Sequence, residues 1–271
     1  MAVFQERRRN QRSGTPASFG SIDSDASALD RAIAADVLLR HLFVPPAQRI
    51  DDIEYAAIYR FAEKHSGGDV IDVYRCCDGK ICLSLTDISG KGVSAALHAG
   101  LVKYGVRAFA SEKHSPKAVL RALNRFYLEN DTFEGTDSFA SVFFAQFDPN
   151  RCSLTYAAAG HEGLILSCGK NDVRVLPPTG PLIGVFEDAP RVFGEETIRV
   201  GRDAVLLAVS DGVTEARTKE ALYGMDPLLE LLARYRDRSM QDLCCAVARD
   251  AVAFAHERVI DDMAVLAVRF G

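Results

Sequence analysis

Four short acidic motifs, spread along the chain between residues 67 and 263, constrain its fold more than any other feature of the sequence. Each motif places an aspartate at the end of an apolar run or in a glycine-rich turn. A carboxylate in such a position sits on a rigid strand end and still remains accessible to solvent and ligands. The motifs are Gly67–Asp72, Asp87–Gly92, Ser210–Gly212 and Asp261–Met263.

Carboxylates brought together from several segments repel one another strongly unless protons or cations lie between them. Oxygen ligands suit the hard divalent cations Mg²⁺ and Mn²⁺. Each motif alone can be read as an ordinary turn with a solvated aspartate. Because four of them occur, each at a strand end, the set predicts one metal site assembled from distant segments.

Length and composition indicate a globular protein. With 271 residues the chain can form one large domain or two small ones with an ample core. Hydrophobic residues make up 48% and charged residues 25%, which argues against a disordered or fibrous class for the whole chain. The net charge of −5 argues against general nucleic-acid binding.

The sequence offers no sign of a membrane or secreted protein. No apolar stretch approaches the ~18–20 residues of a membrane span, and the segment 1–9 lacks the apolar core of a signal peptide. The cysteines, seven in number, show no Cys-x-x-Cys spacing, so neither a disulfide framework nor a zinc site is indicated. We therefore expect a cytoplasmic protein.

The N-terminal part of the chain differs from the rest. Residues 1–26 are polar and lack hydrophobic periodicity, which predicts a disordered tail. The pattern of residues 27–46 predicts a helix that is capped by Ser27 and ended by Pro45 and Pro46. We expect this helix to be a regulatory element or to form a homodimer with a second copy, and residues 47–271 to form the main domain.

The main domain shows runs of short apolar strands and consecutive pairs of helices. The predicted strands are 53–61, 70–76, 81–86, 139–147, 152–159, 164–167, 173–176, 192–200, 204–209 and 263–270. The predicted helices are 92–110, a second beginning at Ser115 and Pro116, 227–235 and 240–256. The apolar stripe of the first consists of Val93, Leu97, Leu101, Tyr104 and Ala108. The apolar stripe of the second consists of Val119, Leu123 and Phe126. This order favours an α+β fold of antiparallel sheets covered by helices.

The Asp87 motif carries the sharpest single signal. A predicted strand brings Asp87 to its end, and the glycines that follow allow the backbone to turn abruptly. A main-chain carbonyl and the carboxylate can then face the same cation. The following helix directs its amide end toward the same region, which favours an anionic group.

The Asp69 and Asp72 motif is weaker. Residues three apart in a regular strand point to opposite faces, so a bulge is needed for both carboxylates to serve one site. The Gly-Gly-Asp sequence is also similar to the signature loop of nucleotide cyclases that make cyclic dinucleotides. Val70 and Ile71 replace the acidic-aromatic pair of that signature, which disfavours a cyclase.

The remaining candidate site residues can also be explained by ordinary structural roles. Asp211 and Glu215, four residues apart, follow a fully apolar strand, and His161 lies in a strand-turn context where a structural histidine is more common than a general acid. Lys91 can contact phosphate, although an exposed loop lysine is the commoner situation. No catalytic triad follows from spacing, and no Walker-type phosphate loop is present.

Together, the motifs resemble those of the metal-dependent protein phosphatases of the protein phosphatase 2C superfamily, in its bacterial SpoIIE/RsbU-like branch. The resemblance runs from about residue 52 to residue 270 with the motifs in the family's order. It includes residues 67–72, 87–97, 159–161, 210–216 and 261–263. It implies an α-β-β-α sandwich, in which two antiparallel sheets are flanked by helix pairs.

The resemblance also implies roles for individual residues. Asp87 would bridge two Mn²⁺ or Mg²⁺ ions with help from the Ile88 carbonyl, and Asp211 and Asp261 would complete the second-metal side. Asp69 and Asp72 would serve the first metal, directly or through water. Four further residues would support the site or contact substrate, namely Asp262, His161, Lys91 and Glu215. The chain departs from the family pattern at three places, and none of these departures removes a proposed ligand. They lie at Ala264, at Glu162 and Gly163, and at Val70 and Ile71.

The implied activity is hydrolysis of phosphoserine or phosphothreonine in proteins. The implied partner is a phosphorylated anti-anti-sigma (STAS) protein in a partner-switching pathway that regulates a sigma factor. The alternative is a catalytically inactive phosphatase-fold module that binds a phosphoprotein. Retention of Asp87, Asp211 and Asp261 argues against that alternative.

Overall fold

The computed structural model describes residues 45, 48–51, 53–62, 67–76, 78–90, 92–112, 115–129, 139–169, 172–186 and 192–271. The predicted tail 1–26, the predicted helix up to residue 44 and Lys91 lie outside these residues, so the expectations for them stay predictions. Among the helices within these ranges, none combines the length and the apolar character that crossing a membrane requires.

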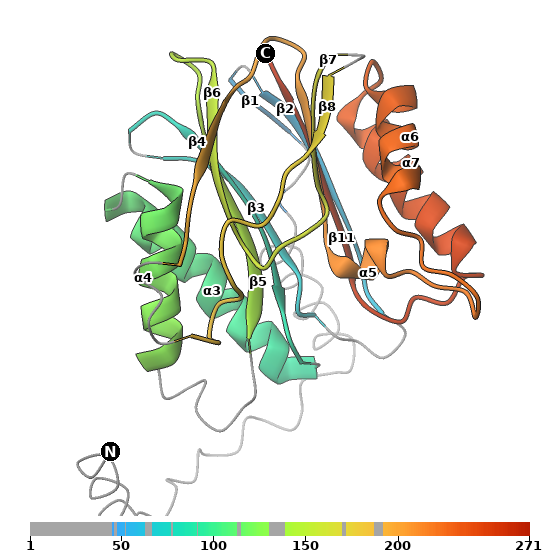
Figure 1. The fold of residues 1–271 in the computed structure, drawn as a ribbon, viewed down its shortest axis with the longest axis horizontal. Coiled ribbons are helices and arrows are strands. Elements are labelled where there is room, and N and C mark those ends of the chain that lie inside the picture. Colours follow the sequence, from blue (N-terminus) through green and yellow to red (C-terminus); the bar gives the residue numbers. More distant parts are fainter. Residues whose placement is uncertain are drawn as a thin grey trace, which may run out of the picture. The chain divides into compact units, whose positions relative to one another are not determined.

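Two antiparallel sheets form the centre of the fold, and Figure 1 shows them side by side. In one sheet the strand order is β1-β2-β11-β10-β7-β8, and in the other it is β3-β4-β5-β6-β9. The first contains β1 (Gln48–Ile50), β2 (Ile53–Arg60), β7 (Leu164–Gly169), β8 (Asp172–Val175), β10 (Val205–Val209) and β11 (Met263–Phe270). The second contains β3 (Val70–Arg75), β4 (Ile81–Ile88), β5 (Ala140–Asp148), β6 (Ser153–Ala159) and β9 (Glu196–Arg199).

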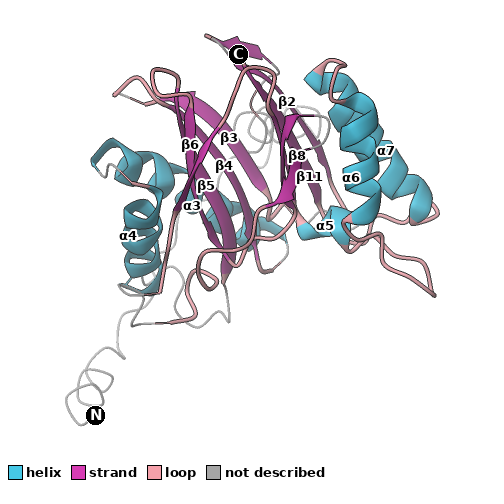
Figure 2. Ribbon diagram, turned by 45° about the horizontal axis from the view of Figure 1, so that its top comes forward, coloured by secondary structure: helices cyan, strands magenta, loops and turns pink. Residues whose placement is uncertain are grey.

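Helices cover the outer face of each sheet (Figure 2). Helices α3 (Gly92–Glu112) and α4 (Pro116–Glu129) pack on the sheet of β3 to β6, whereas α6 (Asp226–Tyr235) and α7 (Met240–Phe254) pack on the other. Strand β10 is buried at every position because one face meets the second sheet and the other meets helices. The predicted α-β-β-α sandwich is confirmed.

The apolar stripe predicted for α3 is wrong at Leu97, Tyr104 and Ala108, whereas Leu101 packs against the buried cluster as predicted. Leu97 and Tyr104 are 56% and 55% exposed, and the helix instead packs on the sheet through Ala99, Val102 and Val106. These small side chains allow the helix to approach the sheet closely, which a face of Leu and Tyr would prevent. The stripe predicted for α4 is confirmed, since Val119 and Leu123 are fully buried and Phe126 packs against the same cluster.

Two other segments differ from expectation. The strand predicted over 192–200 is reduced to β9, because Gly194 donates its N–H to the Thr179 carbonyl (2.8 Å) rather than to β6. The turn predicted after β10 continues into the one-turn helix α5 (Asp211–Thr214), in which the Glu215 N–H donates to the Asp211 carbonyl at 2.6 Å.

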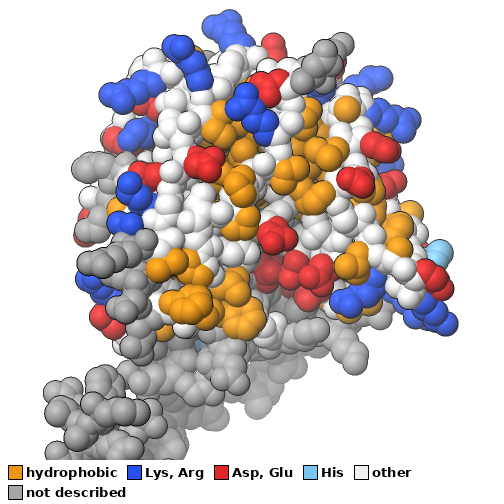
Figure 3. All heavy atoms as spheres, in the orientation of Figure 1, with side chains coloured by type: hydrophobic (Ala, Val, Ile, Leu, Met, Phe, Trp, Pro, Cys, Tyr) orange, Lys and Arg blue, Asp and Glu red, His pale blue; other side chains and the backbone are white. Residues whose placement is uncertain are grey.

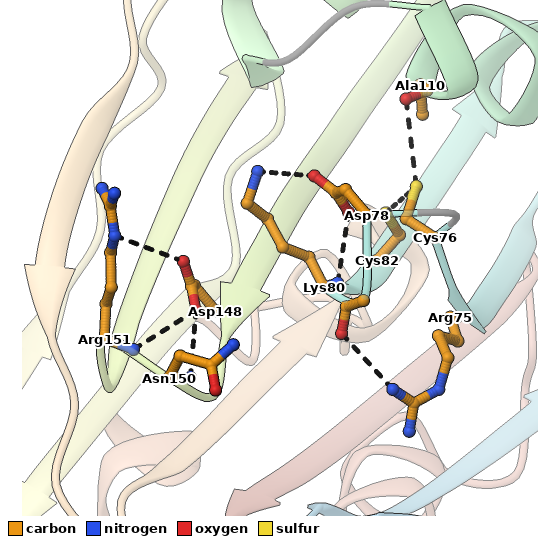
Figure 4. A network of polar contacts seen from close by, with 10 residues as sticks. Arg75, Cys76, Asp78, Lys80, Cys82, Ala110, Asp148, Asn150 and Arg151 are labelled. Carbon is orange, nitrogen blue, oxygen red and sulfur yellow. Dashed lines mark hydrogen bonds and ion pairs between the residues drawn. The ribbon is translucent and has the colours of Figure 1, made fainter.

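Aspartates hold the hairpin turns at the ends of β3 and β5 (Figure 4). Asp78 accepts hydrogen bonds from the Lys80 N–H (3.1 Å) and ammonium (2.7 Å), and Asp148 accepts one from the Asn150 N–H (3.0 Å). Such side-chain bonds favour tight turns. Because turn geometry sets strand register, the Asp78 turn also determines where Asp87 lies at the other end of β4.

Candidate metal centre

Aspartates from four segments meet at one end of the two sheets. Asp87 lies near the end of β4 and is paired with Ser141 of β5. Asp211 begins α5 directly after β10, and Asp261 lies two residues before β11. Asp69 directly precedes β3. The charges of these aspartates act on one another, so the predicted convergence of distant segments occurs in the structure.

Asp87 is the centre of this cluster. The side chains of Asp69 and Asp211 lie close enough to its carboxyl group to act on its pKa. Burial, followed by the charges of Asp211 and Asp261, raises the pKa of Asp87 to about 8. A carboxyl group with this pKa keeps its proton near neutral pH, and a bound cation can displace that proton.

Asp69 is the most enclosed member, with 2% of its surface exposed. Burial and then the charge of Asp87 raise its pKa well above the usual range, although a hydrogen bond from Ser210 opposes this shift. Its Oδ2 atom is buried without a hydrogen-bond partner among the described residues. A buried carboxylate oxygen without a partner is costly, and a proton or a cation relieves that cost.

Gly68 brings the Asp69 loop against the end of β4. Ile88 donates its N–H to the Gly68 carbonyl at 3.2 Å, and a Cβ on Gly68 would lie 2.7 Å from the Ile88 carbonyl oxygen. Only glycine permits this approach. The Ile88 carbonyl, a predicted metal ligand, therefore lies beside the loop that carries Asp69.

Asp262, which lies near the C-terminal end of the chain, holds the same loop through hydrogen bonds. Its buried carboxylate accepts hydrogen bonds from the N–H groups of Gly67, Gly68 (3.1 Å) and Ala62 (2.8 Å) and from the Tyr59 hydroxyl (2.7 Å). These donors occupy both of its oxygens. The placement fits the supporting role that the sequence suggests for Asp262, in contrast to neighbouring Asp261, whose side chain is exposed.

Asp72 does not reach the cluster. Its carboxylate accepts two hydrogen bonds from the Arg107 guanidinium, at 2.5 and 2.8 Å, and lies 3.8 Å from the Lys103 ammonium. Strand β3 pairs with β4 in regular register from Val70 to Arg75, without the bulge that would turn Asp69 and Asp72 to one side. Asp72 thus pairs with Arg107 in this arrangement, and its role as a metal ligand stays a prediction.

His161 is buried beside the cluster as a neutral side chain. Its Nδ1 is 2.9 Å from the Ser141 hydroxyl, and its ring stacks against Phe143 with centroids 6.4 Å apart. Burial lowers the pKa of His161 to about 4, an effect that the Val209 backbone partly offsets. A histidine that stays neutral above this pH positions Ser141 rather than supplying a proton.

The cluster opens into a cleft of ≈ 910 Å³ that contains Asp87, Ile88, Asp211 and Asp261 among its walls. Glu215 also lines the cleft, and its charge helps to raise the pKa of Asp211, after burial and Asp261. Figure 3 shows acidic side chains gathered on this face. In the part of the chain that the structure describes, no three His, Cys, Asp or Glu side chains already converge as a metal-binding group.

The charges of Asp211 and Asp261 instead act on Asp87 from separate segments, and the raised pKa of Asp87 limits the repulsion among them. The donor set is entirely oxygen, and Asp69 contributes a buried oxygen that lacks a partner. These features fit a hard divalent cation better than zinc. Sequence reasoning assigned no role to the hydroxyl groups of Ser210, Tyr59 and Ser141, because these groups act only through tertiary contacts.

Solved structures with the same architecture include phosphatase domains. The SiaA-PP2C domain of Pseudomonas aeruginosa superposes with a TM-score of 0.72 at 15% identity, covering 91% of this chain and 100% of that one. The RsbU and RsbW domains of a Mycobacterium tuberculosis protein give a TM-score of 0.68 at 22% identity, covering 80% and 60%. At these identities the likeness concerns the fold.

Two relatives from Bacillus subtilis (strain 168) are similar in sequence. Phosphoserine phosphatase RsbU is 27% identical over 190 residues, which cover 70% of this chain and 55% of RsbU. Phosphoserine phosphatase RsbP is 25% identical over 201 residues, covering 71% and 46%. The chain thus spans about half the length of these curated relatives.

The family model of Stage II sporulation protein E (SpoIIE) matches residues 77–271, well over half of the chain. The matched region contains Asp87, Asp211 and Asp261 and most of both sheets. The family expected from the order of the acidic motifs is thereby confirmed, and the chain belongs to the SpoIIE family.

Proposed function

We propose that this protein is a divalent-metal-dependent phosphatase that hydrolyses phosphoserine or phosphothreonine in proteins. One observation carries the proposal. Asp87, Asp211 and Asp261 line one open cleft with buried Asp69 next to Asp87, and burial together with the neighbouring carboxylates raises the pKa of Asp87 to about 8. Protons at such a position are readily replaced by cations, and few other roles require an acidic cluster there.

The proposed ligands are Asp87, Asp211 and Asp261 with the Ile88 carbonyl, and Asp69 directly or through water. Together they would hold two Mn²⁺ or Mg²⁺ ions. When bound, such ions make hydroxide available near neutral pH and neutralise phosphoryl oxygens.

Other side chains near the cleft hold the proposed metal ligands in position. Asp262 and Gly68 hold the Asp69 loop in place, and the Ser210 hydroxyl donates to the Asp262 carbonyl at 3.3 Å while accepting the Ala264 N–H at 2.9 Å. None of the described residues that line the cleft is Lys or Arg. The phosphoryl group therefore obtains no balancing charge from those side chains, which explains why the function would depend on metal.

The proposed substrate is a phosphorylated STAS anti-anti-sigma protein in a partner-switching pathway. The names of two relatives support a phosphoserine substrate, and the RsbU and RsbW domains occur together in one neighbouring structure.

Phosphate release from a phosphoserine protein, measured with and without Mn²⁺, tests the proposal. We expect metal-dependent release that Asp87→Asn and Asp211→Asn abolish. Asp172→Asn is the matched control, because Asp172 is an aspartate outside the cleft whose carboxylate pairs with nearby Arg174 (2.8 Å). Binding of the phosphoprotein without release under any metal condition would instead identify the inactive binding module.

A further inference from the structure

The cleft that contains the acidic cluster continues as an apolar wall. Figure 3 shows hydrophobic side chains gathered on the same face as the acidic group. The apolar residues that line the cleft are Phe139, Val175, Leu176, Pro177, Pro178, Leu182, Leu222 and Met225. They come from the start of β5, the end of β8 with the segment after it, and the segment after α5.

Three members of this wall are strongly exposed. Val175 is 52% exposed, Leu222 58% and Phe139 42%. Single exposed apolar residues are common on protein surfaces. Several from separate segments around one cleft, beside a cluster of functional carboxylates, indicate a binding surface.

The wall is held in place by the backbone. Leu176 donates its N–H to Leu164 (2.9 Å), and Thr179 donates to Ala158 (2.8 Å). Leu182 packs so closely on Gly160 that a Cβ there would lie 2.5 Å from its side chain. On the other side, Tyr223 donates to Ala216 (2.8 Å) and positions neighbouring Leu222. A preformed wall loses little conformational entropy when a ligand binds.

Charge determines what this surface can attract. The lining residues include the carboxylates of Asp87, Glu162, Asp211, Glu215 and Asp261 and, among described residues, no Lys or Arg. A phosphorylated segment therefore gains no ion pair with the described side chains that line this cleft, and two described cations, Arg217 and Arg258, line the adjoining pocket beside Asp211 and Asp261. Contact with the apolar wall is then a source of affinity beyond the metal site.

We infer that Val175 and Leu222 recognise a large apolar side chain adjacent to the phosphoserine of a protein substrate. This inference rests on the proposed phosphatase function and names the substrate feature that the same cleft selects. The occupant is an exposed loop or peptide in which phosphoserine is flanked by residues such as leucine.

Two synthetic phosphoserine peptides, identical except for leucine or serine on both sides of the phosphoserine, test the inference. With Mn²⁺ present, we expect kcat/KM to be about tenfold higher for the leucine peptide, mainly through a lower KM, because part of a leucine side chain is removed from water. The ratio of the two kcat/KM values is the quantity that reports recognition.

Val175→Thr and Leu222→Asn make the wall polar without adding charge near the carboxylates. In the double variant we expect the ratio to fall from about ten to about one. Leu97→Asn is the matched control, because Leu97 is equally exposed (56%) but lies outside the cleft, and it should preserve the ratio. Thermal unfolding of each variant confirms that it is folded.

The outcomes separate the two proposals. Equal kcat/KM for both peptides in the unsubstituted protein, or an unchanged ratio in a folded double variant, overturns the apolar recognition while the phosphatase function stands. Absence of phosphate release from both peptides and from p-nitrophenyl phosphate, at any Mn²⁺ or Mg²⁺ concentration, overturns both.

Discussion

Arg107 of α3 binds the carboxylate of Asp72 on β3 through two hydrogen bonds of 2.5 and 2.8 Å. The guanidinium also lies 4.4 Å from the centroid of the Tyr74 ring. The pair joins the first helix after the Asp87 motif to the sheet that carries Asp87. Asp72 therefore acts in helix packing, although its motif suggests a metal ligand.

Asp72→Asn should lower the free energy of unfolding by about 2 kcal/mol, because it removes the carboxylate charge that faces partly solvated Arg107 and buried Lys103. Mn²⁺ affinity should change little. Asp87→Asn should do the opposite and abolish Mn²⁺ binding. Calorimetric titration with Mn²⁺ and denaturant unfolding distinguish the two. Loss of Mn²⁺ binding in a stable Asp72→Asn protein would restore Asp72 as a ligand.

Asp262→Asn should weaken both stability and metal binding. The asparagine replaces one acceptor oxygen by an NH₂ group that faces N–H donors of the Asp69 loop, at a cost of about 2–3 kcal/mol. The loop then loses its position relative to β4. Denaturant unfolding and Mn²⁺ titration measure the two effects, and a variant that binds Mn²⁺ normally would show that the loop is held by other contacts.

The contribution of Asp87 to the stability of metal-free protein should fall as pH rises from the ordinary aspartate pKa of 3.8 to the folded pKa of about 8, because over this range the folded state keeps a proton that the unfolded state has released. Above about pH 6.5 His161 no longer opposes this loss, and from there to about pH 8 the loss is up to about 2 kcal/mol. Scanning calorimetry with EDTA measures it, and Mn²⁺ should raise the melting temperature most at high pH. Asp87→Asn should flatten the dependence.

Between about pH 4 and pH 6.5, His161 should make the folding stability rise with pH, which is opposite to the effect of Asp87. Its pKa is lowered to about 4, so the unfolded state binds a proton below its ordinary pKa near 6.5 while the folded state does not. Stability from this residue is present above pH 6.5 and is lost toward pH 4, by up to about 3 kcal/mol. NMR titration of the imidazole checks the pKa. A His161 that titrates near 6.5 would contradict burial in neutral form.

Gly212→Ala should destabilise the protein by about 3 kcal/mol or prevent folding, since its Cβ would lie 1.9 Å from the Asp262 carbonyl oxygen. Gly201→Ala is the matched control, because a Cβ there meets no atom within 4 Å. Thermal unfolding of both variants measures the difference. Equal stability would mean that the Asp211 turn and the Asp262 segment are less tightly packed.

Strands and fold class follow from local patterns. Segments such as 204–209 are apolar at nearly every position, and a strand of this kind is stable only with both faces covered. The stripe on α3 could not be chosen in this way. The helix carries apolar residues on two faces, and only the sheet surface decides that Ala99, Val102 and Val106 are buried instead of Leu97 and Tyr104.

The sequence alone determined the family, the strand-end position of each aspartate and the prediction of a metal site, because motif order and apolar runs are local properties of the chain. Tertiary structure decided which carboxylates meet. Asp69 reaches Asp87, whereas Asp72, three residues later on the opposite face of β3, pairs with Arg107. That choice depends on side-chain direction and on a partner 35 residues away, and spacing encodes neither.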